Sequence, residues 1–314
     1  MAGKLVVAHH FAPATGALLA GHPAVGDTRA IDPGQRWNLP VDADVIFALH
    51  SATDPTAHHV PRPDGWPGRV KFVQLASSGI DGYPDWLGDG PVVATAAGTS
   101  APAIAEFVLT AMLMHEKRLP AMIASDGHWT SQAEIIAHPL GTLDGKTLGL
   151  LGIGEIGSRV AVLARAFGMT VVVHRRSATP VDGVTLVGFD DLLARADHLV
   201  IAAPISPETT GLIGTDALAK VRRGVHIVNI ARGGIINTDA LVAALASGHV
   251  GAASLDVTDP EPLPPGHPLW TAPNARITPH IAWSSAKTPQ RIFALFAENI
   301  SRFVRGDRLI NQLD

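Results

Sequence analysis

Short apolar runs bounded by Gly, Pro and Asp alternate with helical patterns along most of the chain. Before residue 100, four such runs predict strands, and they cover residues 5–8, 45–49, 70–75 and 92–94. Runs that are apolar at consecutive positions are typical of parallel strands that helices cover on both faces. From Pro102 to about residue 119 the apolar positions follow a helical period, and a proline suits the first helical turn.

A second series of elements begins near Lys146. Strands are predicted at residues 147–151, 170–174, 199–203, 226–230, 252–257 and 276–277. Helical segments such as 158–167 and 238–247 lie between them, and a final helix is expected over 288–304. This alternation indicates a doubly wound α/β architecture, and the final helix is long enough to return to the first domain.

The first strand of this second series leads directly into a glycine-rich loop, Gly152-Ile-Gly154-Glu155-Ile156-Gly157. In a dinucleotide site the first glycine permits a tight turn, the second lets the pyrophosphate approach the backbone, and the third lets the helix pack on the strand. The helix N-terminus then offers free N–H groups to the phosphates. Glycine-rich loops can also simply close turns, but the order strand, loop, helix, strand favours the nucleotide site.

The end of the following strand indicates which nucleotide is bound. NAD-binding versions carry an acid about 20 residues after the loop, where it accepts hydrogen bonds from the ribose. Here Arg175, Arg176 and Ser177 occupy that region, and no acid occurs between Phe167 and Pro180. Guanidinium groups and a hydroxyl suit a 2′-phosphate, so we expect NADP(H) to be preferred, with NAD(H) still possible. The alternative is two solvated arginines at a strand end.

Composition limits the classes of function. A chain of 314 residues suggests two domains, and 46% hydrophobic with 17% charged residues indicates a globular protein. The formal net charge of −4 gives no reason to expect nucleic acid or an anionic membrane as a partner. Cysteine is absent, which removes thiolate catalysis and disulfides and fits a cytoplasmic location. We expect neither a signal peptide nor a membrane span.

Three further segments carry side chains suited to chemistry. Arg232 follows an apolar strand, Glu261 lies in a proline-flanked loop after another, and His280 stands beside a proline after a third. Each has an ordinary explanation by itself, as a surface charge, a loop carboxylate or a structural histidine. Because the carboxyl ends of the strands form the ligand-binding edge of such a sheet, their joint occurrence favours one active site.

With these motifs in order, the chain resembles the D-isomer-specific 2-hydroxyacid dehydrogenases, in particular the glyoxylate and hydroxypyruvate reductases, nearly from end to end. The resemblance rests on segments 75–81, 105–106, 152–157, 202–209, 229–233, 259–262 and 278–282. It implies a Rossmann nucleotide-binding domain, residues 102–280, inserted in a smaller flavodoxin-like substrate domain, residues 1–101 plus 281–314. It also implies a homodimer formed mainly through the nucleotide-binding domain, with Asp126–Trp129 and the chain up to Leu143 at the interface.

The resemblance assigns roles to individual residues. Arg232 would bind the substrate carboxylate and polarise the ketone, His280 would be the general acid, and Glu261 would orient His280 and favour its protonated form. The backbone N–H groups of Ser78 and Gly79 would hold the other side of the carboxylate.

Further residues would border the cofactor. On the adenosine and pyrophosphate side these are Ala203, Pro204 and Thr209, and on the nicotinamide side Ile230, Ala231, Asp256 and His280. Trp283 would either wall the substrate pocket or pack between the domains.

The expected reaction is reduction of a small 2-keto acid, with glyoxylate and hydroxypyruvate as leading substrates. By resemblance, Glu261 in place of Gln argues against formate, Ser78 in place of Lys argues against phosphite, and the small Thr99 replaces the tyrosine of D-lactate dehydrogenases. Two alternatives stay open: a larger keto acid such as phenylpyruvate, and a non-catalytic NAD(P)H-sensing protein. No metal site is expected, because the pairs His9–His10 and His58–His59 lack a third ligand at a diagnostic spacing.

Overall fold

The computed structural model describes residues 4–50, 59–119, 131–177 and 179–313. It divides into two compact units, Met1–Ser100 with Ser285–Asp314, and Ala101–Ser284. The second boundary falls after Ser284 instead of after His280, the boundary that the sequence suggested. The physical reason is local: residues 281 and 282 donate backbone hydrogen bonds to a carboxylate of the second unit.

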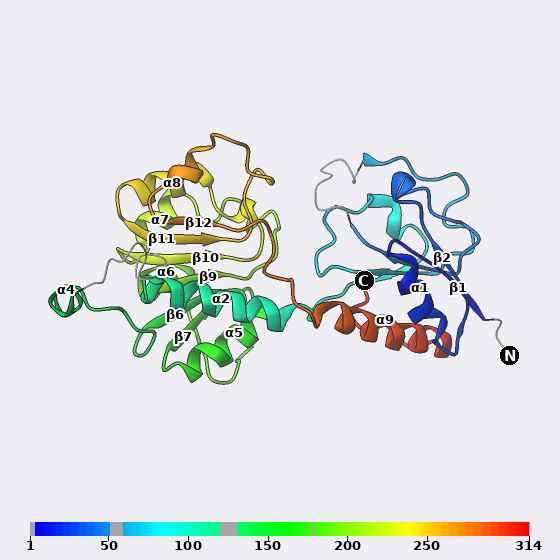
Figure 1. Cartoon of the computed structure of the whole chain (residues 1–314), viewed down its shortest axis with the longest axis horizontal. Coiled ribbons are helices and arrows are strands. Elements are labelled where there is room, and N and C mark those ends of the chain that lie inside the picture. The colour runs from blue at the N-terminus through cyan, green and yellow to red at the C-terminus, as the bar shows by residue number, and fades with distance from the viewer. Residues whose placement is uncertain (1–3, 51–58, 120–130, 178, 314) are drawn as a thin grey trace. The chain divides into compact units, whose positions relative to one another are not determined.

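The first unit is built on a parallel sheet of five strands with the order β2-β1-β3-β4-β5 (Figure 1). The strands are β1 (Leu5–His9), β2 (Val25–Ala30), β3 (Val45–Ala48), β4 (Phe72–Leu75) and β5 (Val92–Ala94). This is the flavodoxin-like order, which confirms the predicted fold class. The apolar pattern missed β2, because this edge strand buries only Val25 fully and has no apolar run.

Helices α1 (Pro13–Ala20) and α9 (Thr288–Arg305) complete the first unit, with the 3₁₀ turns η1 (Pro33–Gln35) and η3 (Asp85–Gly88). Phe296 and Ile300 of helix α9 lie in one apolar cluster with Phe47 and Phe72 of the sheet, and the Phe47 and Phe296 ring centroids lie 4.2 Å apart. The buried amide of Asn299 donates to the Gln74 side chain at 2.8 Å. Apolar packing and a satisfied buried amide therefore hold the C-terminal segment on the N-terminal sheet.

The second unit is built on a parallel sheet of seven strands with the order β12-β11-β10-β9-β6-β7-β8. The strands are β6 (Thr147–Leu151), β7 (Thr170–His174), β8 (Thr185–Leu186), β9 (His198–Ile201), β10 (Val225–Asn229), β11 (Val250–Leu255) and β12 (Ala275–Ile277). From β8 through β6 to β12 this is the Rossmann order, with the strand order reversing at β6. The predicted nucleotide-binding fold is confirmed.

Helices cover both faces of this sheet (Figure 1). The covering helices are α2 (Ala101–Glu116), α5 (Glu155–Ala166), α6 (Phe189–Arg195), α7 (Thr215–Lys220) and α8 (Thr238–Ala246). The short helix α4 (Gln132–Ala137) projects away from the sheet, and the 3₁₀ turns are η4 (Gly233–Ile235) and η5 (Pro268–Thr271). Successive side chains of β7 alternate between the faces: Val171 and Val173 belong to the apolar cluster that includes α2 and α5, and Val172 belongs to the one that includes α6, α7 and α8. Within the described ranges, no helix is long and apolar enough to cross a membrane.

A chain of polar side chains runs through the interior of the second unit. The Nε2 of His198 lies 3.0 Å from Oε1 of Glu116, and its Nδ1 lies 3.1 Å from Nδ1 of His226. The Nε2 of His226 lies 2.9 Å from the Ser254 hydroxyl, and Lys146 donates to Glu116 at 2.6 Å. This chain joins the C-terminus of α2 to β9, β10 and β11.

Burial makes His226 and its neighbour His115 hard to protonate. Desolvation, followed by the charge of His198, lowers the pKa of His226 well below its usual range. The same causes lower the pKa of His115, whose ring stacks on that of His226, to about 4. Burial would raise the pKa of Glu116, but hydrogen bonds from His198 and Lys146 outweigh it and lower that pKa to about 2.

We predict that this cluster makes the protein less stable in mild acid. Between the ordinary histidine pKa of 6.5 and the folded-state value of about 4 for His115, the unfolded chain binds more protons than the folded one. The free energy of unfolding therefore falls as the pH drops through this window and is fully retained above it. Denaturant titrations across the window measure the effect. His115→Gln should flatten the profile, whereas substitution of the exposed His59 should not, and a flat wild-type profile would contradict the prediction.

Candidate active site

The three side chains suggested by the sequence lie at the carboxyl ends of adjacent strands of the second unit. Arg232 follows β10, Glu261 lies in the loop after β11, and His280 follows β12. These strands are neighbours in the sheet, and parallel strands direct the segments that follow them to the same edge. The structure therefore brings together groups from three separate parts of the sequence.

His280 and Glu261 form a direct pair. The Nδ1 of His280 lies 2.7 Å from Oε1 of Glu261, and the side chains are 38% and 34% exposed. Burial would raise the pKa of Glu261, but the hydrogen bond and charge of His280 lower it, helped by the Thr258 N–H at 3.2 Å and by the charge of Arg232. The carboxylate is thus ionised at neutral pH and fixes the orientation of the imidazole ring. The other ring nitrogen of His280, Nε2, takes no part in this pair.

The backbone that carries His280 is held by the buried carboxylate of Asp256. Its Oδ1 accepts hydrogen bonds from the Thr278 hydroxyl at 2.6 Å and from the Ile281 N–H at 2.9 Å, and its Oδ2 accepts one from the Ala282 N–H at 2.9 Å. His280 also donates its N–H to the Asp256 carbonyl at 2.9 Å. His280 has a φ of 52°, in the left-handed region that few non-glycine residues adopt, and these hydrogen bonds hold it there.

The turn that carries Arg232 is held by the buried Asn229 at the end of β10. The Asn229 amide donates to the Arg232 carbonyl at 2.9 Å and accepts from the Ala231 N–H at 3.1 Å. The next residue must be Gly233, because a Cβ there would lie 2.0 Å from the Thr258 carbonyl group. This close approach brings the Arg232 turn against the loop that carries Glu261.

The glycine loop has the geometry that a dinucleotide requires. Gly152 has a φ of 93°, and a Cβ there would lie 2.8 Å from the backbone nitrogen of Ala203. A Cβ on Gly157 would lie 2.6 Å from the Gly152 carbonyl oxygen, so the start of α5 packs directly on the turn. A Cβ on Gly154, the N-cap of α5, would meet nothing within 4 Å. The open side of the loop, at a helix N-terminus, fits a pyrophosphate.

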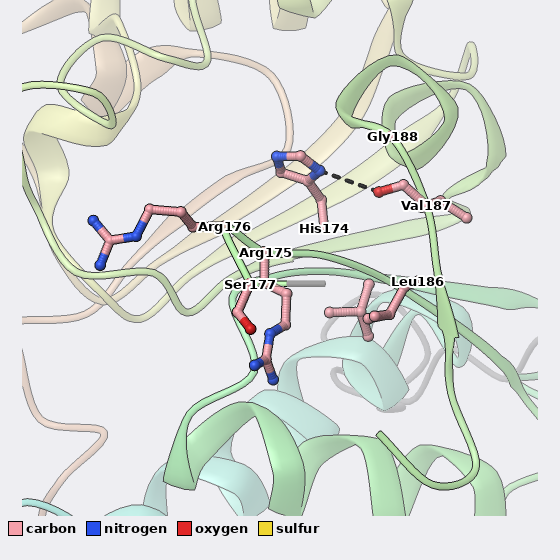
Figure 2. A pocket seen from close by; sticks show the side chains of 8 residues that line it. His174, Arg175, Arg176, Ser177, Leu186, Val187 and Gly188 are labelled. Carbon is pink, nitrogen blue, oxygen red and sulfur yellow. Dashed lines mark hydrogen bonds between the residues drawn. The ribbon is translucent and has the colours of Figure 1, made fainter. Parts of the chain in front are cut away.

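A pocket lies beside this loop, at the end of β7. It has a volume of about 290 Å³ and is lined by residues 173–177 and 186–188 (Figure 2). The Gly152 N–H donates to the His174 carbonyl at 2.9 Å, which joins the loop to the pocket. Figure 2 shows the guanidinium groups of Arg175 and Arg176 pointing in different directions. Arg175 is half-buried and Arg176 is exposed, and the charge of Arg176 helps to lower the pKa of the nearby Glu208 carboxyl.

The remaining predicted cofactor residues lie along the same edge. Ala203 and Pro204 follow β9, and the Thr209 hydroxyl closes this loop by donating to the Pro204 carbonyl at 2.8 Å. Ile230 and Ala231 follow β10, which pairs with β9. In the glycine loop, Glu155 is exposed and Ile156 is half-buried. Elsewhere in this unit, Ser177 is exposed after β7, and Trp283 is 49% exposed after β12.

Ser78 and Gly79 belong to the other unit, where they follow β4 at the carboxyl edge of the first sheet. Ser78 is exposed and Gly79 is half-buried. Thr99 is buried, and its hydroxyl donates to the Ala96 carbonyl at 2.7 Å. The Thr99 hydroxyl therefore stabilises the turn at residues 96–99.

The sequence reasoning missed positioning residues. It took Asp256 only as a border of the nicotinamide, and Asn229 only as part of a motif. The available signal was a polar residue at the end of an apolar strand, because such a buried group must find hydrogen-bond partners in the adjoining turn.

Of the two histidine pairs considered as metal ligands, the pair His9–His10 lies among backbone groups of the first unit. His9 is buried, and His10 contacts the Arg36 carbonyl at 2.7 Å and accepts from the Leu49 N–H at 3.1 Å. Within the described ranges, no three His, Asp or Glu side chains are grouped as metal ligands. His58 and Asp126–Trp129 lie outside the described residues.

Comparison with known proteins adds independent evidence. The family model described as the NAD binding domain of D-isomer specific 2-hydroxyacid dehydrogenases matches residues 109–282. A glyoxylate reductase of Aeropyrum pernix is 37% identical over 69% of this chain and 68% of its own length. A D-3-phosphoglycerate dehydrogenase of Mycobacterium tuberculosis is 33% identical over 96% of this chain, which spans 57% of that protein. The crystal structure of a D-isomer specific 2-hydroxyacid dehydrogenase from Xanthobacter autotrophicus Py2, in complex with NADPH and MES, is 29% identical with a TM-score of 0.80, covering 99% of this chain and 98% of that one.

Asp256→Asn should loosen the turn that carries His280. Both carboxylate oxygens accept from N–H or O–H groups, so an amide NH₂ in either place would face a donor. We expect a loss of about 1–3 kcal/mol in the free energy of unfolding and faster amide hydrogen exchange in residues 278–282. Asp182→Asn, at an exposed loop carboxylate of the same unit, is the control. Unchanged exchange in the turn would show that Asp256 does not hold it.

Proposed function

Because the chain belongs to the D-isomer-specific 2-hydroxyacid dehydrogenase family, and is thus an NAD(P)-dependent oxidoreductase, we propose that it reduces a small 2-keto acid to the D-2-hydroxy acid. Glyoxylate and hydroxypyruvate are the leading substrates. The observation that carries the proposal is the 2.7 Å pair of His280 and Glu261 beside the Arg232 turn. A histidine fixed by a carboxylate next to an arginine suits general acid catalysis on an anionic carbonyl compound.

In the proposed reaction, the bound reduced nicotinamide supplies the hydride that the keto carbon accepts. His280 gives the proton on Nε2 to the carbonyl oxygen, while Glu261 accepts the hydrogen bond from Nδ1 and stabilises the protonated ring. Arg232 holds the substrate carboxylate and polarises the ketone, because charge-assisted hydrogen bonds are strong in a partly desolvated site. The N–H groups of Ser78 and Gly79 bind the same carboxylate from the first unit.

We propose NADP(H) as the preferred cofactor and NAD(H) as a second one. The support is the pocket at the end of β7, where Arg175, Arg176 and Ser177 replace the acid that would accept from the ribose of NAD. Since the two guanidinium groups diverge, one of them would rotate to reach the same phosphate (Figure 2). The other proposed cofactor contacts are Gly152, Gly154, Glu155, Ile156, Gly157, Ala203, Pro204, Thr209, Ile230, Ala231, Asp256 and His280.

The substrate class is supported by side chains in both units. Glu261, in place of a glutamine, argues against formate as the substrate, and Ser78, in place of a lysine, argues against phosphite. Thr99 is small and buried where D-lactate dehydrogenases have tyrosine. Trp283 is proposed as a wall of the substrate pocket, since this large apolar side chain is 49% exposed just beyond His280. If the protein reduces none of the small keto acids, two alternatives remain. Its substrate is a larger keto acid such as phenylpyruvate, or the protein binds NAD(P)H without catalysing a reaction.

We also propose a homodimer formed through the nucleotide-binding unit. The support is α4, whose side chains are all exposed, including Ile135 at 49% and Ile136 at 72%. A short helix that exposes large apolar side chains gains stability by burying them against a second copy. A cytoplasmic location is proposed from the absence of cysteine in all 314 residues.

Turnover tests the proposed reaction. The absorbance of reduced nicotinamide should decay with NADPH and glyoxylate or hydroxypyruvate, and less with pyruvate or phenylpyruvate. His280→Ala should lower kcat by at least about 100-fold while NADPH still binds, because general acid catalysis contributes this much. His249→Ala, at the opposite edge of the same sheet, is the control. Binding of NADPH with no decay for any keto acid would favour the sensing protein.

Cofactor choice tests the 2′-phosphate site. Replacing Arg175 and Arg176 together with Ala should raise the KM for NADPH by at least about 10-fold and change that for NADH little, because only NADPH carries the 2′-phosphate. A variant with Arg195 and Arg223 both replaced by Ala, two exposed arginines of the same unit, controls for the change in net charge. Equal losses for both cofactors would rule out this assignment.

A further inference from the structure

The loop after β4 has a firmly held base and an exposed tip. At the base, the Ala76 N–H donates to the Ala48 carbonyl at 2.8 Å and the Ala96 N–H donates to the Ser77 carbonyl at 2.8 Å. Towards the tip, Ser78 is exposed and Ile80 is 56% exposed. The proposed function places the substrate carboxylate on the N–H groups of this tip, so its rigidity matters for binding.

One hydroxyl connects the base to the tip. The Ser77 hydroxyl donates to the Gly79 carbonyl at 2.6 Å. The ring closed by this hydrogen bond contains the peptide units 77–78 and 78–79, and these units carry the N–H groups of Ser78 and Gly79. Because a glycine loses much conformational freedom when it is ordered, this side-chain bond limits the conformations that Gly79 can adopt.

The Ser77 hydroxyl is in turn held by Tyr83. The two hydroxyl oxygens lie 3.0 Å apart, and the Tyr83 oxygen is 3.4 Å from the Ala48 carbonyl. Since the Ser77 proton is directed to Gly79, the Tyr83 hydroxyl donates to Ser77 at the shorter of these two distances. The result is a directed chain from the Tyr83 hydroxyl through the Ser77 hydroxyl to the Gly79 carbonyl, in which each bond polarises the next.

The Tyr83 side chain lies in a buried aromatic cluster. The residue is only 3% exposed, and its ring makes edge contacts with those of Trp37, at 5.9 Å, and His50, at 5.6 Å. Burial raises the pKa of Tyr83 to about 12, although the hydrogen bond with Ser77 acts in the opposite sense. The phenol therefore keeps its proton at every working pH and acts as a permanent donor.

From this geometry we propose that Tyr83 is a positioning residue for substrate binding: through the Ser77 hydroxyl it preorganises the Ser78–Gly79 loop that receives the substrate carboxylate. This inference rests on the proposed function, because it assumes that the Ser78 and Gly79 N–H groups bind a 2-keto acid. Tyr83 itself is buried beneath the loop and acts only through Ser77.

Steady-state kinetics of hydroxyl deletions test the proposal. Tyr83→Phe keeps the ring and removes one hydroxyl, and should raise the KM for the keto acid about 5-fold while kcat and the KM for NADPH stay unchanged. Ser77→Ala should give at least the same rise, and Ser77→Thr, which keeps a hydroxyl, should recover most of it. The double variant should be no worse than Ser77→Ala, because Tyr83 acts through Ser77.

Two controls separate positioning from general stability. Trp37→Phe alters the same cluster without removing a hydroxyl, so it should lower the Tm and leave the KM for the keto acid unchanged. Hydrogen exchange of residues 76–82 should become faster in Tyr83→Phe but not in Trp37→Phe.

The outcomes distinguish this inference from the proposed function. If the wild type reduces a keto acid and Tyr83→Phe retains its KM, the positioning role is wrong and the proposed function stands. If Tyr83→Phe and Ser77→Ala raise the KM additively, the hydroxyls act separately and the relay is wrong. If the wild type reduces no keto acid, both proposals are overturned.

Discussion

The candidate active site depends on one buried carboxylate. Asp256 accepts hydrogen bonds from the Thr278 hydroxyl and the Ile281 and Ala282 N–H groups, and these bonds hold His280 in a left-handed conformation. Without such bonds that conformation would be strained, and the imidazole would lose its fixed position next to Glu261. The same bonds place residues 281 and 282 in the nucleotide-binding unit, so one side chain determines both a domain boundary and the geometry of the proposed general acid.

A common arrangement recurs at the carboxyl ends of both sheets. A buried polar side chain at or beyond a strand end satisfies its hydrogen bonds with the turn that follows, and the turn then presents backbone or side-chain groups. Asn229 does this for the Arg232 turn, and Ser77 with Tyr83 does it for the loop at Gly79. Because unsatisfied buried polar groups are costly, each of these turns has few alternative conformations. The framework therefore supplies preorganisation as well as position.

Two histidines of the second unit, His280 and His226, differ in function because they differ in solvent exposure and in their hydrogen-bond partners. The His280 side chain is 38% exposed and paired with an ionised carboxylate, which suits proton transfer at the surface of the unit. His226 lies fully buried between His198 and Ser254, where desolvation lowers its pKa and makes it a neutral part of the interior. Both follow or lie within apolar strands, so the sequence pattern around them is similar. The difference lies in solvent access and partners, which are tertiary properties.

The sequence alone predicted most strands of both sheets, the glycine loop, and the positions of Arg232, Glu261 and His280 after apolar strands. These features were predictable because local apolar periodicity and glycine spacing reflect local geometry. The tertiary structure decided the rest: that the edge strand β2 exists despite its mixed composition, that β10, β11 and β12 are neighbours, and that Asp256 and Tyr83 hold turns. Such contacts join residues distant along the chain, and the hydrogen bonds that satisfy a buried polar group depend on which segments pack against it.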